Sequence, residues 1–303
     1  MPKTLAITGA TGFVGSAAVD AALEAGFGVR ALTRRDQAER EGVTWVKGTL
    51  DDEAALGDLV KGVDAVLHIA GLTNTPDPQE FARANVIGTA NVIEAMKSKA
   101  VKRLVFVSSL SAREPKLSKY GASKRDAEEL VSESGLEWTT VRPPAVYGPR
   151  DKDMFELFRS AKMGLVPLPP SGGTSLIHVT DLAELLVALA PKRKLKEIYE
   201  PDDGRQGGWS HKEMAQAIGR AMGKGSVFAP NLPSTVLGLA AGFDRMIRGD
   251  RAKLTADRVG YMSHPNWIAR FDRAVPEHIW KPRIDSEEGL KATADWYRAE
   301  GWL

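Results

Sequence analysis

Cysteine is missing from this 303-residue sequence, which excludes disulfides and thiol chemistry and suits a reducing compartment. No apolar run approaches the roughly 20 residues that a membrane-spanning helix needs. The opening residues, MPKTLAITGATG, show no charged-then-apolar leader, so no signal peptide is predicted. These absences predict a cytoplasmic protein with no membrane partner.

Excess charge and metal-ligand patterns are also lacking. Forty-one basic residues against 39 acidic residues give a formal charge of +2, which favours no nucleic-acid partner. The five histidines show no metal-ligand spacing with another His, Asp or Glu, so no metal site is predicted. Two of them, His68 and His178, lie beside strand-like runs and are expected to have hydrogen-bonded structural roles.

The first half of the chain alternates between two patterns. Short apolar runs that are typical of buried parallel strands occupy residues 5–8, 29–33, 43–48, 64–70, 103–109 and 137–143. Helical segments are predicted between them at 14–25, 53–61, 79–98 and 118–134. Such alternation predicts an α/β fold, a Rossmann-type doubly wound parallel sheet with right-handed crossovers.

After Pro143 this alternation stops, and the tail is mainly helical. We expect residues 1–150 to form the doubly wound Rossmann domain, to which residues 175–200 return. Residues 151–174 and 201–303 are expected to form a smaller, mainly helical substrate-binding lobe. The apolar segment Val236–Phe243, broken by Gly238 and Gly242, is interpreted as a packed helix, with a membrane or partner surface as the alternative.

A glycine-rich loop follows the first predicted strand and opens the first helix. In Thr8–Gly15 the spacing is Gly-x-x-Gly-x-x-Gly, which permits a tight turn, close backbone approach to a pyrophosphate and close helix packing. A glycine triplet alone is also common in ordinary turns, but its position here predicts dinucleotide binding. The residues of this loop expected to hold the cofactor are Gly9, Thr11, Gly12, Phe13, Val14 and Gly15.

The second predicted strand ends in Thr33-Arg34-Arg35-Asp36. Folds that prefer NAD usually place a carboxylate at this strand end, whereas guanidinium groups suit the 2′-phosphate of NADP. Arg34 and Arg35 therefore predict NADP(H) in preference to NAD(H). Two solvated arginines in a surface loop are the alternative interpretation.

Tyr120 and Lys124 are one helical turn apart, just after a serine at the end of the fifth predicted strand. An ammonium beside a phenol stabilises its anion and makes proton exchange near neutral pH feasible. The hydroxyl of Ser109 could then hold a substrate carbonyl oxygen toward Tyr120. Tyr-x-x-x-Lys by itself occurs by chance in many helices, so the prediction depends on the glycine loop and the strand end.

In order along the chain, TGATGFVG, HIAG, NVIGTANV, the strand-end serine, YGASK, RPPAVYGP and HVTDLA resemble the signatures of the extended short-chain dehydrogenase/reductase family. The ending EEGLKATADWYRAEGWL resembles dihydroflavonol-reductase-like and epimerase/dehydratase members. The resemblance implies an NAD(P)-dependent oxidoreductase with Ser109, Tyr120 and Lys124 as its catalytic triad and Asn85 as a fourth, structural-catalytic residue. It also implies a homodimer as the typical assembly.

The same resemblance adds residues to the expected cofactor site. Lys124 would bond the nicotinamide ribose, Ala70 would line the cofactor, and the backbone from Pro143 to Val146 would hold the nicotinamide end. The family often has an adenine-contacting aspartate after the third strand. Here Thr49 matches it, so that contact is expected to be weakened or moved to Asp51, and Leu50 beside it is also expected to contact the cofactor.

Two points stay open in the sequence. Ser111 is close enough to Ser109 that the catalytic serine is not unique, although the VFVSS strand end favours Ser109. The predicted reaction is NADP(H)-dependent hydride transfer between nicotinamide and a carbonyl/alcohol substrate, with apolar segments 154–170 and 228–243 favouring a partly hydrophobic one. The alternatives are a nucleotide-sugar epimerase, dehydratase or reductase, with Arg150, Arg159, Lys162 or Arg205 on the diphosphate, and a non-catalytic NADP(H)-binding regulator.

Overall fold

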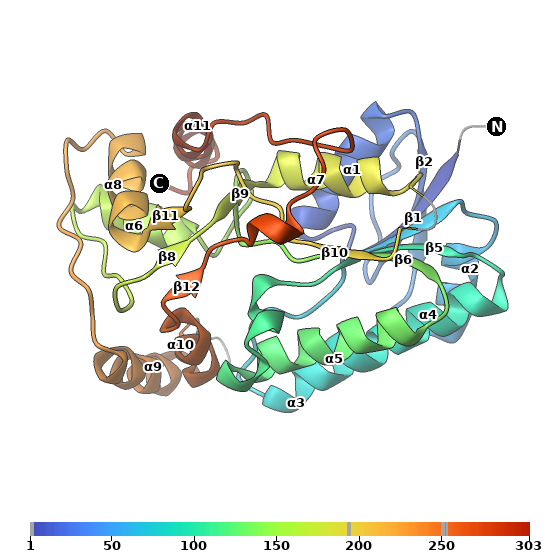
Figure 1. Cartoon of the computed structure of the whole chain (residues 1–303), viewed down its shortest axis with the longest axis horizontal. Coiled ribbons are helices and arrows are strands. Elements are labelled where there is room, and N and C mark those ends of the chain that lie inside the picture. The colour runs from blue at the N-terminus through green and yellow to red at the C-terminus, as the bar shows by residue number, and fades with distance from the viewer. Residues whose placement is uncertain (1–2, 193–194, 250–251, 253) are drawn as a thin grey trace. The chain divides into compact units, whose positions relative to one another are not determined.

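The computed structural model divides the chain into two compact units (Figure 1). The structure describes residues 3–192, 195–249, 252 and 254–303. The first unit comprises Met1–Arg142, Leu182–Tyr199 and Val275–Lys281, and the second comprises Pro143–Asp181, Glu200–Ala274 and Pro282–Leu303.

A seven-stranded parallel sheet forms the centre of the first unit, in the order β10-β6-β5-β4-β1-β2-β3. Its strands are β1 (Thr4–Thr8), β2 (Gly28–Thr33), β3 (Val43–Lys47), β4 (Ala65–His68), β5 (Arg103–Val107), β6 (Glu137–Val141) and β10 (Glu197–Tyr199). The order reverses between β1 and β4, since β2 and β3 follow on one side of β1 and β4, β5, β6 and β10 on the other. In doubly wound sheets, ligands bind at the carboxyl ends of the strands on either side of such a reversal.

Helices cover both faces of this sheet. They are α1 (Phe13–Glu24), α2 (Glu53–Val60), α3 (Pro78–Phe81), a π-helical turn (Ala82–Ile87), α4 (Gly88–Ser98), α5 (Lys119–Glu133) and α7 (Val179–Leu189). Two 3₁₀ turns, Leu110–Arg113 and Pro115–Leu117, connect β5 to α5. In Figure 1, α4 and α5 run along one face and α1 lies along the other.

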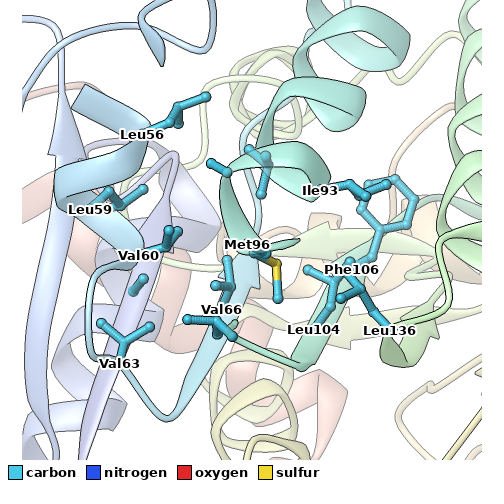
Figure 2. Close-up of a cluster of buried hydrophobic side chains, with 14 of the residues drawn as sticks. Leu56, Leu59, Val60, Val63, Val66, Ile93, Met96, Leu104, Phe106 and Leu136 are labelled. Atoms are coloured by element: carbon cyan, nitrogen blue, oxygen red, sulfur yellow. The ribbon is translucent and has the colours of Figure 1, made fainter. Parts of the chain in front are cut away.

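An apolar cluster fixes α2 and α4 onto the sheet (Figure 2). Alternate residues of central parallel strands point to opposite faces, so these strands are apolar throughout and bury both sides. The side chains labelled in the figure are Leu56, Leu59, Val60, Val63, Val66, Ile93, Met96, Leu104, Phe106 and Leu136. This packing holds the strand ends and the helices that follow them in fixed positions.

Small sheets and five helices make up the described part of the second unit. Strands β7 (Ala145–Tyr147) and β9 (Leu176–His178) pair in parallel, and β8 (Gly173–Thr174) lies between β11 (Trp209–Ser210) and β12 (Asn266–Trp267). The helices are α6 (Phe155–Lys162), α8 (His211–Ala221), α9 (Ser234–Arg248), α10 (Ala256–Met262) and α11 (Ser286–Ala299), with a 3₁₀ turn at Phe271–Arg273. Phe158 and Tyr297 are fully buried in the core of this unit.

The prediction of a Rossmann-type doubly wound sheet followed by a smaller, mainly helical lobe is confirmed. One predicted element differs in detail, because the helix expected over 79–98 contains the π-helical turn Ala82–Ile87. Among the described residues, no helix combines the length and the apolar character that crossing a bilayer requires.

Candidate active site

The glycine loop forms the turn between β1 and α1. Gly9 has a φ of +71°, and a Cβ on it would lie 2.7 Å from the backbone nitrogen of Ala70. A Cβ on Gly15 would collide with the carbonyl of Gly9, so the start of α1 packs directly on the turn. Only glycine meets these two demands.

At the start of α1 the backbone is available to an anion. Gly12 is the N-cap of this helix and supplies no side-chain cap, so the first N–H groups of the helix lack that partner. Thr11 and Gly12 are exposed, whereas Phe13 and Val14 are half-buried. An uncapped helix N-terminus behind a glycine turn fits the pyrophosphate of a dinucleotide.

Two arginines extend from the end of β2. The side chains of Arg34 and Arg35 are exposed, and neither makes an ion pair or hydrogen bond with another described residue. The Thr33 hydroxyl donates to the Arg35 carbonyl across 2.7 Å and closes the turn that presents them. The neighbouring carboxylate of Asp36 lies 2.8 Å from the ammonium of Lys47, so a cation already occupies it.

Leu50 and Asp51 follow β3. The Asn91 carboxamide donates to the Leu50 carbonyl across 2.8 Å, and Leu50 fills the space that a Cβ on Gly88 would need. Asp51 pairs with Arg83 at 2.8 Å, with both side chains largely exposed. The loop is thereby tied to the helix that contains Asn85.

Ser109 and Ser111 share one hydrogen-bonded turn at the end of β5. The Ser111 hydroxyl donates to Ser109 Oγ across 3.0 Å, and the Ser111 backbone N–H donates to the same oxygen across 3.2 Å. Ser111 is buried, whereas Ser109 is half-buried. Since Ser109 Oγ accepts both bonds, its own hydrogen remains available for a third partner.

Tyr120 lies in the first turn of α5, which packs on this serine turn. Ser118 caps the helix by accepting the Gly121 N–H across 2.9 Å. A Cβ on Gly121 would lie 2.7 Å from the Ser111 carbonyl, so the helix start touches the backbone of the serine turn. The ring of Tyr120 packs 5.8 Å from that of Phe81.

Lys124 is buried one helical turn after Tyr120. Its ammonium donates to the Val107 carbonyl, the last residue of β5, across 2.7 Å and lies 4.8 Å above the Phe106 ring. Burial lowers the pKa of Lys124 to about 8, and the negative charge of Glu128 opposes part of this shift. Glu128 is itself held in a buried bidentate ion pair by Arg142, at 2.6 and 2.8 Å.

Asn85 lies in the π-helical turn, and its carboxamide ties three segments together. Its oxygen accepts the Leu72 N–H across 2.7 Å, and its nitrogen donates to the Leu72 carbonyl across 3.0 Å. The same nitrogen donates to Ser123 Oγ across 2.9 Å, and Ser123 donates to the Tyr120 carbonyl across 2.8 Å. Asn85 therefore fixes both the loop after β4 and the start of α5.

Gly71 lies next to Asn85 and Lys124, and it was not among the site residues predicted from the sequence. A Cβ at this position would lie 3.0 Å from Asn85 Oδ1 and 3.5 Å from Lys124 Nζ. The absence of a side chain leaves room for a ligand next to the lysine. The HIAG motif contained the signal, because it places a glycine directly after Ala70.

His68 connects the glycine loop to the asparagine. Its Nδ1 lies 2.7 Å from Thr8 Oγ1, and its Nε2 lies 2.9 Å from Thr89 Oγ1. Thr89 donates its own hydrogen to the Asn85 carbonyl across 2.6 Å, so Thr89 must accept from His68 Nε2–H. Thr8 then donates to Nδ1 while accepting the Ala70 N–H across 3.1 Å. The ring is neutral and fully hydrogen-bonded, as its expected structural role requires.

Pro143 and Val146, whose backbone was predicted to hold the nicotinamide end, lie in the second unit. Val146 is the middle residue of β7 and pairs with Ile177, and Pro143 precedes that strand as a buried residue. His178 packs edge-on against Tyr147 and accepts the Thr180 N–H at 3.2 Å. Among the residues described in either unit, no group of three or more His, Asp or Glu side chains could hold a metal ion.

The two apolar segments predicted near the substrate pair with each other. Phe228 donates to the Gly164 carbonyl and accepts from the Val166 N–H at 2.8 and 2.9 Å, and the Leu168 N–H bonds the Pro230 carbonyl at 2.9 Å. Val166 and Leu168 are buried, but the Phe228 side chain is exposed. Phe158, in the first of these segments, belongs instead to the core of this unit.

Known proteins resemble the chain along most of its length. The sequence pattern described as the NAD dependent epimerase/dehydratase family matches residues 5–200. Ceramide reductase from Caulobacter vibrioides (strain NA1000 / CB15N) is 33% identical over 310 residues, covering 99% of this chain and 96% of that protein. For 2-alkyl-3-oxoalkanoate reductase from Stenotrophomonas maltophilia (strain K279a), the identity is 28% and the coverage 94% and 96%.

Solved structures share the fold. The structure of MoeE5 in complex with UDP-glucose and NAD aligns with a TM-score of 0.74 and 24% identity, covering 98% of this chain and 99% of that one. The likeness therefore extends through the second unit as well as the glycine-loop domain.

Proposed function

The chain belongs to the NAD-dependent epimerase/dehydratase family, and from this premise we propose that it is an NADP(H)-dependent reductase of ketones with long apolar chains. Membership of the family makes it an NAD(P)-dependent oxidoreductase. The cofactor preference, the catalytic roles and the substrate class are our proposal. The observation that carries it is the hydrogen-bonded linkage of the segments bearing Ser109, Tyr120, Lys124 and Asn85.

In the proposed reaction each of these residues has one task. Ser109 donates its hydroxyl hydrogen to the substrate carbonyl oxygen, because Ser109 Oγ already accepts two hydrogen bonds from Ser111. Tyr120 donates a proton to the same oxygen during reduction, and the Lys124 ammonium stabilises the phenolate that results. A bound nicotinamide supplies the hydride. Asn85 holds α5 and the loop after β4 in position, and the space over Gly71 leaves Lys124 access to the cofactor ribose.

The preference for NADP(H) is supported by the end of β2. The guanidinium groups of Arg34 and Arg35 are exposed and have no described partner, so binding a 2′-phosphate would break no interaction. The one carboxylate that could hold a 2′-hydroxyl there, Asp36, is paired with Lys47.

The substrate class is supported by the relatives. Two relatives aligned over nearly the full length are named as reductases, one of ceramide and one of a 2-alkyl-3-oxoalkanoate. Both names describe compounds with alkyl chains. The absence of cysteine suits a reducing compartment, so we propose a cytoplasmic activity.

The test is NADPH oxidation by the full-length protein with 3-oxo compounds of increasing alkyl length, presented in mixed micelles where they are insoluble. Each buried methylene contributes about 0.8 kcal/mol, so kcat/KM should rise about fourfold per carbon until the site is filled. Tyr120→Phe should lower kcat by roughly 10²-fold or more while NADPH still binds. Turnover that is independent of chain length would contradict the substrate class, and an active Tyr120→Phe would contradict the acid role.

A nucleotide-sugar substrate is the alternative, since MoeE5 has the same fold and was solved with UDP-glucose. Two of the arginines suggested for the diphosphate already have partners, because Arg159 pairs with Glu156 at 2.6 Å and Arg205 with Glu213 at 2.8 Å. Calorimetry with UDP-glucose decides between the two substrates, and binding that Arg159→Ala abolishes would favour the sugar. NADPH binding without turnover of any carbonyl or sugar would indicate the regulator.

A further inference from the structure

The helix α9 (Ser234–Arg248) presents an apolar face to solvent. Leu239, Phe243, Met246 and Ile247 are exposed by 78, 60, 73 and 64%. With about 100° per residue, these four side chains and Val236 fall within an arc of about 120° on the helix. The described charged residues of α9 all lie outside this arc.

The inward side of α9 is already packed against other residues of the second unit. Leu237 and Ala241 are buried and pack with Val259 of α10 and with Leu232 and Leu254. The exposed face is therefore additional to the one that holds α9 in place, and folding of the second unit does not explain it. Exposed contiguous apolar surface of this kind marks an interaction site.

Charge next to the helix indicates the partner. Asp244, the single acidic residue of α9, lies 3.3 Å from Arg248 and accepts the Leu254 N–H across 3.0 Å, so its charge is compensated. In the sequence, residues 244–253 contain four arginines or lysines against two aspartates. A broad apolar face next to a basic end is typical of helices that lie in the surface of an anionic membrane.

The size of the face argues against a second copy of the chain as its main partner. A helix of 15 residues is about 22 Å long, and one face of it offers only part of the roughly 800 Å² that each partner of a stable complex buries. A lipid surface sets no such requirement, because a few bulky side chains and basic groups suffice for reversible attachment.

We propose that α9 is a membrane-surface helix, with Leu239, Phe243, Met246 and Ile247 between the acyl chains of an anionic bilayer and Arg245 and Arg248 at the headgroups. This proposal takes up the alternative of a membrane surface for residues 236–243, against the expectation of a packed helix with no membrane partner, since an interfacial helix needs no apolar run of about 20 residues. The benefit of attachment, access to a substrate that resides in the bilayer, rests on the proposed function. The attachment itself does not, because it requires no turnover.

The experiment is co-sedimentation of the full-length protein with vesicles of phosphatidylglycerol and phosphatidylcholine, without substrate. Binding should exceed that to pure phosphatidylcholine vesicles and decrease with salt. The combined variant Leu239→Gln/Phe243→Gln/Met246→Gln/Ile247→Gln should lower the partition coefficient by about tenfold or more. Its melting temperature and NADPH affinity should match those of the wild type, because these side chains are exposed and the cofactor loop is in the other unit.

A matched control replaces equally exposed apolar residues elsewhere in the second unit, Met163→Gln and Phe271→Gln, and should bind vesicles like the wild type. No wild-type binding, or equal loss in the control, would overturn the proposal. Light scattering provides a separate check, since a wild-type dimer that the α9 variant converts to a monomer would instead make the face a self-association surface. Vesicle binding is measured without turnover. A negative result for binding therefore does not contradict the proposed ketone reduction, and a negative result for ketone reduction does not contradict membrane binding.

Discussion

Thr8 and His68 lie 60 residues apart in the chain, and the Thr8 hydroxyl donates to His68 Nδ1 across 2.7 Å. This bond joins the end of β1, where the glycine loop begins, to the end of β4. Through Thr89 the same ring reaches the carbonyl of Asn85. One neutral imidazole thus connects the glycine loop to the segment of Asn85, which bonds the start of α5 through Ser123.

Because His68 must stay neutral, it should make stability depend on pH. Burial, reinforced by the charge of Lys124, lowers its pKa from 6.5 to about 3. The unfolded chain binds this proton and the folded chain does not, so the contribution is complete above pH 6.5 and is lost as the pH falls toward 3. His68→Gln should remove up to about 1.4 kcal/mol per pH unit from the slope of unfolding free energy within that window.

Denaturant titrations between pH 4 and 7 measure this slope. His278→Gln removes an exposed imidazole and should retain the wild-type slope. A His68→Gln slope that matches the wild type would show that the ring takes up its proton in the folded state. NADPH affinity should also fall in His68→Gln, since Ala70 loses the support of Thr8.

The sequence predicted the sheet because buried parallel strands are apolar throughout and the helices between them keep a 3.6-residue period. It could not predict the π-helical turn, since the apolar spacing of 82–87 fits an α-helix as well. The bonds of Asn85 to Leu72 and Ser123 depend on how distant segments meet. In α9 the period predicts a helix, but only tertiary packing decides that Leu237 is buried while Leu239 is exposed.

Lys124 should define the alkaline limit of activity. Its pKa of about 8 lies well below the ordinary 10.5 because the ammonium is buried, while Glu128 opposes the shift. The proposed role needs the charged form, so kcat for ketone reduction should decline as the pH rises past about 8. Removing the opposing charge in Glu128→Gln/Arg142→Gln, which deletes both partners of the buried pair, should move this decline to lower pH.

Rate profiles of the wild type and the double variant between pH 6 and 10 provide the measurement, with melting temperatures recorded at each pH. An unmoved alkaline limb in a folded double variant would assign the limb to another group. Lys124→Met should abolish the limb together with most of the activity.

A side chain at position 71 is expected to impair NADPH binding. The Cβ of Gly71→Ala would stand 3.0 Å from Asn85 Oδ1 and 3.5 Å from Lys124 Nζ, in the space assigned to the cofactor ribose. NADPH affinity should fall by roughly tenfold or more with little change in melting temperature. Gly57→Ala in α2 is the matched control, because its Cβ meets only Lys99 Cε at 3.5 Å and alanine favours a helix by about 1 kcal/mol. Equal NADPH affinity in Gly71→Ala and wild type would place the ribose elsewhere.

Replacing Ser109 and replacing Ser111 should lower kcat by different amounts. Ser109→Ala removes the hydroxyl proposed to touch substrate and should lower kcat by about 10²-fold. Ser111→Ala removes only a donor to Ser109, so a loss of about tenfold or less is expected. Steady-state kinetics at saturating NADPH measure both, and the reverse order of effects would make Ser111 the catalytic serine.

Arg34 and Arg35 should determine the choice between the two nicotinamide cofactors. Each guanidinium can form charge-assisted bonds to a 2′-phosphate worth about 1.5–3 kcal/mol, so Arg34→Ala/Arg35→Ala should weaken NADPH binding by about 10²-fold or more and leave NADH binding nearly unchanged. Fluorescence titration with both cofactors gives the ratio. Asp36→Asn is the matched control, and since Lys47 already occupies this carboxylate, the ratio should hardly change. If the arginine variant keeps its preference for NADPH while Asp36→Asn loses affinity for NADH, then Asp36 rather than the two arginines recognises the adenosine ribose.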